Sequence, residues 1–182
     1  MKILTGVSQQ KSASLALDEA TSGWNEYSNS INFILLFHST EQDSQELAAE
    51  VARRFPGIPS IGCSTAGEYL NGKHLNGSLV VTALASKEIQ WAVTCVPNLS
   101  ELTAEMAEKV AAQMASQFGV ETDTLNPSEY FCLGFVDGLS MKEEVASALL
   151  ADAFKGIPFL GGSSGDDLKF KKTFLLANGM FS

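Results

Sequence analysis

Small hydroxyl, thiol and carboxyl residues gather beside glycines at three places in the chain. The first place, residues 60–68, carries Cys63, Ser64, Thr65 and Glu68. Each place follows an apolar run, and glycine permits the tight turn and close backbone approach that the end of a buried strand requires. If the three turns lie at one edge of a sheet, their side chains and backbone N–H groups form one polar pocket.

The second and third places are residues 134–140 and residues 160–167. Hydroxyl and backbone N–H donors in such turns would bind a carboxylate, while a side-chain carboxylate would bind an ammonium group. We therefore predict a ligand that carries both charges, as an amino acid does. The predicted ligand-binding residues are Cys63, Ser64, Thr65, Glu68, Asp137, Gly162, Ser163, Ser164 and Asp166.

Cys63 is the residue of this set that could form a covalent bond. A thiolate beside backbone N–H groups has a lowered pKa and acts as a nucleophile or redox sensor, so a cysteine-dependent enzyme is one alternative function. A catalytic cysteine also requires a base, and the two histidines form no recognisable Cys/His signature with it. A buried apolar thiol without chemistry is the simpler interpretation, and we expect no catalysis.

Carboxylates near the second and third turns could instead bind a divalent cation through oxygen ligands. Two of them, Glu143 and Glu144, also suit the first turn of a helix, where negative charge is favourable. Ser140 would then be the N-cap, and Glu143 would complete a capping box. We expect this structural role and no metal site. The candidate oxygen ligands are Asp137, Glu143, Glu144, Asp166 and Asp167.

Composition indicates a cytoplasmic globular protein. The 182 residues are 45% hydrophobic, which suffices for a core, and the net charge of −9 comes with no basic patch of the kind that binds nucleic acid. No signal peptide is recognisable, and no apolar stretch is long enough to span a bilayer. Three cysteines without zinc-ligand spacing are typical of reduced intracellular thiols.

The hydrophobic pattern predicts an α/β fold. Strand-like runs near residues 3–7, 33–37 and 58–61 alternate with helical patterns, and this β-α-β-α-β order predicts parallel strands. Residues 79–85 and 89–96 predict an antiparallel hairpin, because only three residues separate them. We therefore expect a mixed sheet with helices on both faces and the glycine-rich turns at one edge. Further helices are predicted at 102–118 and 142–154, and further strands at 130–136, 157–160 and 173–177.

A weak internal repeat relates residues 55–64 to residues 154–163. In both stretches a strand and a helix precede a Gly-Ile-Pro sequence, which leads into a glycine-rich turn. A duplicated β-α-β unit would place residues 63–65 and 162–164 at equivalent positions that face each other.

The three glycine motifs, in this order, resemble the N-terminal domain of the FIST sensory family. The matching segments are GCSTAGE at 62–68, DGLS at 137–140 with Glu143 and Glu144 after it, and GGSSGDD at 161–167 with Thr173 and Asn178-Gly179 after it. The resemblance covers nearly the whole chain, so we assign residues 1–182 to one such domain. Because family members normally continue into a C-terminal FIST domain, we expect a truncated protein that lacks this second domain.

The resemblance implies a sensory input domain of a bacterial signal-transduction protein that binds a small molecule, proposed for amino acids. The implied partners are the C-terminal FIST domain and a signalling protein such as a histidine kinase, a chemoreceptor or a cyclic-di-nucleotide enzyme. Some bacterial relatives resemble haem-dependent nitric-oxide sensors. Haem is therefore an alternative ligand, with His38 and His74 as candidate axial residues.

Overall fold

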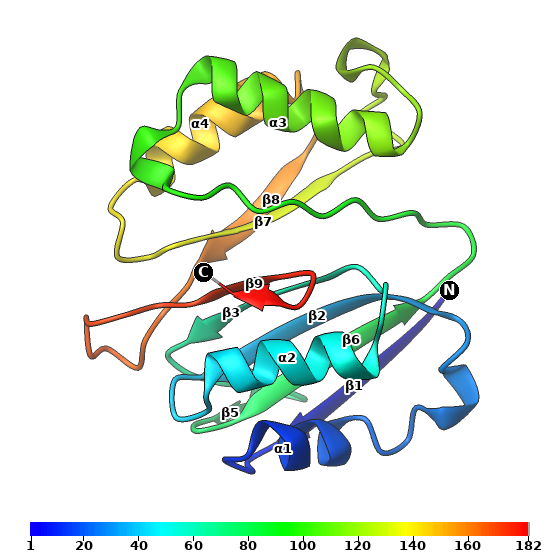
Figure 1. Cartoon of the computed structure of the whole chain (residues 1–182), viewed down its shortest axis with the longest axis vertical. Coiled ribbons are helices and arrows are strands. Elements are labelled where there is room, and N and C mark those ends of the chain that lie inside the picture. Colours follow the sequence, from blue (N-terminus) through cyan, green and yellow to red (C-terminus); the bar gives the residue numbers. More distant parts are fainter. Residues whose placement is uncertain (182) are drawn as a thin grey trace.

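The computed structural model describes residues 1–181, which fold into two halves stacked one above the other (Figure 1). The lower half in that view is built on a mixed six-stranded sheet. The upper half is built on two parallel strands, β7 (Cys132–Val136) and β8 (Phe159–Ser163). The prediction of an α/β fold with a mixed sheet is confirmed.

The large sheet has the strand order β1-β6-β2-β3-β9-β10. Its strands are β1 (Lys2–Ser8), β2 (Ile31–Ser39), β3 (Ser60–Thr65), β6 (Leu79–Ala85), β9 (Leu175–Ala177) and β10 (Met180–Phe181), and a small hairpin pairs β4 (Glu68–Leu70) with β5 (Lys73–Leu75). The α-helices are α1 (Ala13–Ala20), α2 (Ser44–Arg54), α3 (Ala104–Gln117) and α4 (Glu143–Ala153), and short 3-10 helices cover Asn25–Tyr27, Leu99–Glu101 and Thr122–Thr124. No helix of the described chain is long and apolar enough to cross a membrane.

Each half has its own hydrophobic core. In the lower half, α1 and α2 pack together on one face of the large sheet, where Leu17 and Leu47 meet Ile34 and Leu36 of β2. In the upper half, α3 and α4 pack against each other through small residues such as Ala111 and Ala146. Alternation along the rest of β2 places Phe33, Leu35 and Phe37 on the opposite face of the sheet.

That opposite face of the large sheet is turned toward the upper half. Phe37 of β2 meets Phe135 of β7 edge-on, with ring centroids 5.4 Å apart. The second pair of helices therefore lies beyond β7 and β8 rather than directly on the large sheet. Helices flank the sheet on both sides, as the sequence predicts, but a layer of strands separates α3 and α4 from it (Figure 1).

The strand order corrects the simple β-α-β-α-β expectation. β2 and β3 are parallel neighbours, as predicted. β6, however, is inserted between β1 and β2 and runs antiparallel to both of them. β1 therefore runs in the same direction as β2, but the two strands are not hydrogen-bonded to each other.

The predicted hairpin of residues 79–85 with residues 89–96 does not form. Residues 79–85 are β6, but both edges of β6 are already occupied by β1 and β2, so no edge is left for the following segment. Residues 89–96 instead leave the sheet and cross toward the upper half without entering a strand. Trp91 in this segment stacks on Phe33 of β2, with centroids 3.9 Å apart and planes 14° apart.

The internal repeat corresponds to two parallel β-α-β units, β2-α2-β3 and β7-α4-β8. The end of β3 contacts the turn that follows β8, because the Gly165 N–H donates to the Ser64 carbonyl at 2.8 Å. The two glycine motifs at the ends of these units therefore meet.

The predicted capping box at α4 is wrong. The residue that precedes the helix is Lys142, and no side chain caps its N-terminus. The Ser140 hydroxyl donates to the Asp137 carbonyl at 2.6 Å, so it closes the turn after β7 instead.

The buried face of β2 should dominate the stability of the lower half. Leu36 is 0% exposed, and Leu36→Ala should lower the free energy of unfolding by about 2–5 kcal/mol, because it removes buried methyl groups and leaves a cavity. Urea denaturation followed by tryptophan fluorescence measures this change. The control is Leu15→Ala, at a side chain that is 56% exposed, which should change stability by less than about 0.5 kcal/mol. Equal effects of the two substitutions would contradict this account of the core.

Candidate functional site: a cavity between the two halves

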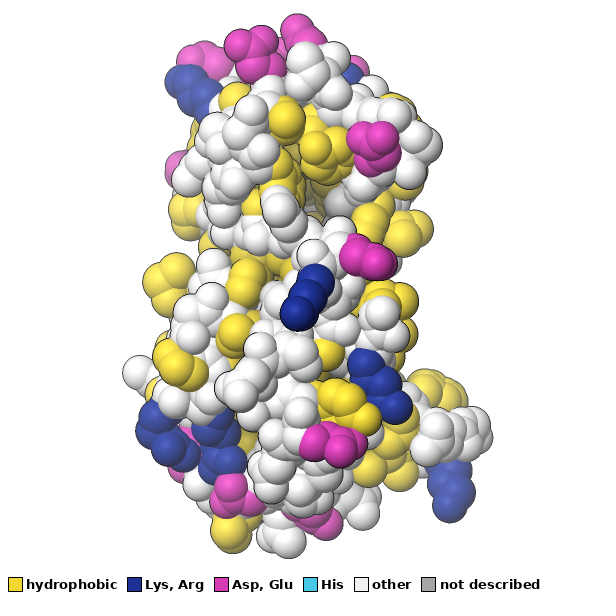
Figure 2. Space-filling view, turned by 90° about the vertical axis from the view of Figure 1, so that its right-hand side faces the viewer, with side chains coloured by type: hydrophobic (Ala, Val, Ile, Leu, Met, Phe, Trp, Pro, Cys, Tyr) yellow, Lys and Arg dark blue, Asp and Glu magenta, His cyan; other side chains and the backbone are white. Residues whose placement is uncertain are grey.

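A cavity of about 930 Å³ lies between the large sheet and the upper half. Its walls come from β3 and β9 on one side, from β7, α3 and α4 on the other, and from residues 88–96, which cross between the halves. Such a volume lies within the range of small-molecule sites. In the space-filling view, hydrophobic side chains come to the surface in the upper half and along the narrowing between the halves (Figure 2).

Aromatic side chains form part of the cavity wall. Trp91 stacks on Phe33 and meets Phe131 edge-on, with the second pair of ring centroids 5.7 Å apart. Stacked and edge-on pairs of this kind hold aromatic side chains in defined orientations. This part of the wall is therefore apolar, built by residues from β2, from the crossing segment and from the position that precedes β7. The sequence analysis did not place these residues in a site.

Asp137 lies at the end of β7 and faces this cavity. Its Oδ1 atom accepts a hydrogen bond from the Thr173 hydroxyl at 2.6 Å and another from the Leu139 N–H at 2.9 Å. No residue among 1–181 donates to its Oδ2 atom. The carboxylate is therefore held by one oxygen while the other remains available.

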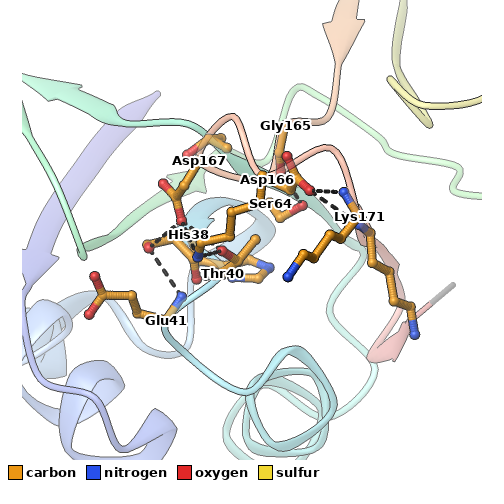
Figure 3. Close-up of polar contacts among 12 residues, drawn as sticks. His38, Thr40, Glu41, Ser64, Gly165, Asp166, Asp167 and Lys171 are labelled. Carbon is orange, nitrogen blue, oxygen red and sulfur yellow. Dashed lines mark hydrogen bonds and ion pairs between the residues drawn. The ribbon is translucent and has the colours of Figure 1, made fainter.

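Ser64 joins the first glycine motif to the third (Figure 3). Its hydroxyl donates to the Gly165 carbonyl at 2.7 Å and accepts from the Phe174 N–H at 2.9 Å, while its carbonyl accepts from the Gly165 N–H at 2.8 Å. The side chain is 0% exposed. Its hydrogen bonds are thus made within the protein, and they fix the third turn against β3.

Glu68 and Thr65 form a second internal cluster. Glu68 is buried, and its two carboxylate oxygens accept hydrogen bonds from the hydroxyls of Thr65 and Ser78. These contacts tie the end of β3 to the residue that precedes β6. They satisfy a carboxylate that would otherwise be costly to bury.

Ser164 connects the second motif to the third. Its buried hydroxyl donates to the Val136 carbonyl at 3.1 Å and accepts from the Gly138 N–H at 3.3 Å. Its neighbours Gly162 and Ser163 are exposed at the end of β8. The structure therefore brings all three motifs into contact, through Ser64 and Ser164.

Asp166 shapes the loop that follows the third motif (Figure 3). Its carboxylate accepts from the N–H groups of Lys171 at 2.6 Å, Phe170 at 2.9 Å and Lys172 at 3.1 Å. These bonds, that of Lys171 above all, lower the pKa of Asp166. They also hold a strained backbone, because Leu168 and Phe170 have φ angles of 59° and 52° in the left-handed region that such residues avoid.

Asp167 and Thr40 anchor the same loop to the end of β2. Thr40 donates its hydroxyl proton to Asp167 Oδ2 at 2.6 Å, and Lys169 Nζ donates to the Thr40 hydroxyl at 2.9 Å (Figure 3). The loop therefore crosses the carboxyl ends of β2 and β3. It occupies the edge where the sequence predicts a ligand pocket.

Of the nine predicted ligand-binding residues, Asp137 is the one that lines the cavity within the described chain. Ser64, Ser164 and Asp166 make hydrogen bonds inside the protein and build the turns. A direct role for these turn residues in binding stays a prediction.

A family model of the FIST N domain matches residues 32–182. The chain belongs to the FIST family. FIST N domains are sensory domains found in signalling proteins. No curated protein and no solved structure matches the chain. The match begins at β2, so it includes both β-α-β units and every segment that walls the cavity.

Cys63 of this FIST N domain is a buried thiol. It is 2% exposed, and burial raises its pKa to about 12. The thiol is therefore protonated at neutral pH, whereas a nucleophilic cysteine requires a thiolate. This environment supports the interpretation of Cys63 as a packing residue of β3.

The two histidines lie away from the cavity of this FIST N domain. His38 is buried at the end of β2 with Nδ1 2.9 Å from the Ser39 carbonyl oxygen, and His74 lies in β5 beside Tyr69, with ring centroids 5.0 Å apart. Burial lowers the pKa of His38, which the Ser39 hydrogen bond and the Asp167 charge partly oppose. Neither ring is among the described residues that line the cavity, so these histidines do not fit an axial role toward a haem bound there.

Among residues 1–181, no three or more His, Cys, Asp or Glu side chains are grouped as a metal ion requires. The acidic residues of the second and third motifs serve the turns and, in the case of Asp137, the cavity wall.

Native alkylation should separate Cys63 from Cys95. A pKa of about 12 leaves roughly one thiolate in 10,000 at pH 8, and Cys63 is also buried, so iodoacetamide should label exposed Cys95 first. Cys63 should react only after unfolding in urea. Mass spectrometry of the digested protein measures both rates. Rapid labelling of Cys63 in the folded protein would revive the cysteine-dependent enzyme.

Asp166 should contribute acid-sensitive stability. Its pKa is lower in the folded than in the unfolded protein, so its contribution is complete above the unfolded value of 3.8 and disappears as the pH falls through the lowered folded value. Asp166→Asn should therefore destabilise the protein at pH 6, and the difference from wild type should shrink below pH 4. Urea titrations at several pH values measure it. A difference that does not change with pH would contradict this role.

Proposed function

We propose that this FIST N domain is the input domain of a bacterial signalling protein, and that a small molecule such as an amino acid binds in the cavity between its two halves. The cavity of about 930 Å³ is the observation that carries the proposal. It combines apolar walls with one oriented carboxylate, the pattern that typifies small-molecule sites. Asp137 would bind the ammonium group of the ligand through Oδ2.

The position of the cavity suggests how binding is passed on. Both β-α-β units contribute to its walls, so a ligand that touches β3 and β7 together favours one placement of the halves over others. Residues 89–96 lie in the wall without a strand partner, and they join β6 to α3. A ligand packed against Trp91 would therefore favour one conformation of the segment that joins β6 to α3.

We infer that the partners are a C-terminal FIST domain and a signalling protein such as a histidine kinase, a chemoreceptor or a cyclic-di-nucleotide enzyme. Large apolar side chains at the surface support contact with another domain: Met141, Leu160, Leu168 and Phe170 are each more than half exposed. The three unpaired cysteines suit the reducing cytoplasm.

A cavity-filling substitution tests the location of the ligand. Ala92→Phe places a ring in the cavity wall on a segment outside any strand, and Ala112→Phe places the same ring on the exposed surface of α3. A thermal-shift screen of free amino acids and other small molecules should find a ligand that stabilises wild type and Ala112→Phe. At a hundred times its dissociation constant, the expected stabilisation is about 2.7 kcal/mol.

The same ligand should fail to stabilise Ala92→Phe, whose folding is checked by circular dichroism. Undiminished stabilisation of a folded Ala92→Phe protein would move the site away from the cavity. Ser64→Ala and Asp166→Ala would then test the turns. A screen without any stabilising compound would argue against small-molecule sensing by this domain.

A further inference from the structure

We propose that the cavity selects an apolar amine, and that Asp137 is the residue that binds its ammonium group. The inference rests on the proposed function, because it names the ligand class of the same cavity. It differs from the sequence-based expectation in one respect. A carboxylate on the ligand, as in an amino acid, is not needed for binding and works against it.

The charges of the cavity wall carry the inference. Its lining includes three carboxylates, Glu88, Glu129 and Asp137, and no Lys, Arg or His from the described part of the chain. A negatively charged group that enters loses water, finds no cationic partner and meets like charges. An ammonium group meets opposite charges only. The wall therefore favours cations over anions.

Asp137 is the carboxylate best placed to bind that cation. Glu88 and Glu129 are exposed, whereas Asp137 is half-buried at the end of β7. Thr173 and the Leu139 N–H hold its Oδ1 atom, which directs the group before any ligand arrives. An ammonium N–H can therefore donate to Oδ2 without breaking an existing bond, and a charge-assisted hydrogen bond of this kind is among the stronger ones.

An aromatic side chain near Asp137 suits the rest of such a ligand. Phe135, two residues before Asp137 on β7, lies in the cavity lining and meets Phe37 edge-on, with ring centroids 5.4 Å apart. Its ring offers apolar contact to an alkyl or aromatic body, and the face of an aromatic ring attracts a nearby ammonium group. Phe33, Trp91 and Phe131 line the cavity toward the other end of β7, about 20 Å from Asp137 along the strand, and extend the apolar wall away from the carboxylate.

Three compounds with one benzyl group separate the charge requirements. They are 2-phenylethylamine, with an amine alone; L-phenylalanine, with both charges; and 3-phenylpropanoate, with a carboxylate alone. Isothermal titration calorimetry at pH 7 should rank them in that order, with the amine about tenfold or more tighter than the carboxylate. Added salt should weaken binding of the amine, since the attraction is electrostatic.

Two variants assign this preference to Asp137. Asp137→Asn retains an oxygen acceptor for Thr173 and Leu139 but loses the negative charge, and it should weaken amine binding about tenfold or more. The matched control Glu129→Gln removes an exposed charge from the same cavity and should have a much smaller effect. Equal losses in the two variants, or an unchanged affinity in folded Asp137→Asn, would overturn the role of Asp137.

The outcomes distinguish this inference from the function on which it rests. Tighter binding of 3-phenylpropanoate than of the amine, with both lost in Ala92→Phe, would overturn the amine preference and leave the cavity as the ligand site. Amine binding that persists in folded Ala92→Phe would overturn both. Failure of all three compounds to bind would overturn the inference, while the broader thermal-shift screen decides separately whether the cavity binds another class of small molecule.

Discussion

The reciprocal hydrogen bonds between Ser64 and Gly165 hold the two halves of this FIST N domain together at one edge. Each residue donates to the carbonyl of the other, from the Ser64 hydroxyl and from the Gly165 N–H. Because Ser64 is fully buried, water does not compete for these bonds, and an unpaired hydroxyl there would be costly. The position of β8 relative to β3 depends on this contact.

The cavity is a consequence of joining the halves in this way. Each half buries its own core with its own pair of helices, so the strand faces turned toward each other need not pack completely. Phe37 and Phe135 connect the two halves across this space at one point, and the segment that contains Trp91 connects them at another. The remaining space is lined by apolar strand residues and by acidic side chains. The cavity therefore has room for a ligand and a negatively charged wall.

Much of the fold was predictable because local patterns decide it. The apolar run of β2, the amphipathic pattern of α2 and the strand-helix-strand order of the second unit are all present where expected. The site was less predictable. Hydroxyls and acids beside glycines are what a ligand pocket uses, but they are also what a tight turn uses, and Ser64 and Asp166 are engaged in turns. Residue types alone do not distinguish the two uses.

The sequence by itself determined which segments are apolar and periodic enough to become strands and helices, and which short motifs must form turns. The tertiary structure alone decided how the strands are ordered. Residues 89–96 have the pattern of a strand but form none, because β1 and β2 occupy both edges of β6. It also decided that Asp137 faces a cavity while Asp166 faces backbone N–H groups, since the surroundings of a carboxylate come from segments distant in sequence.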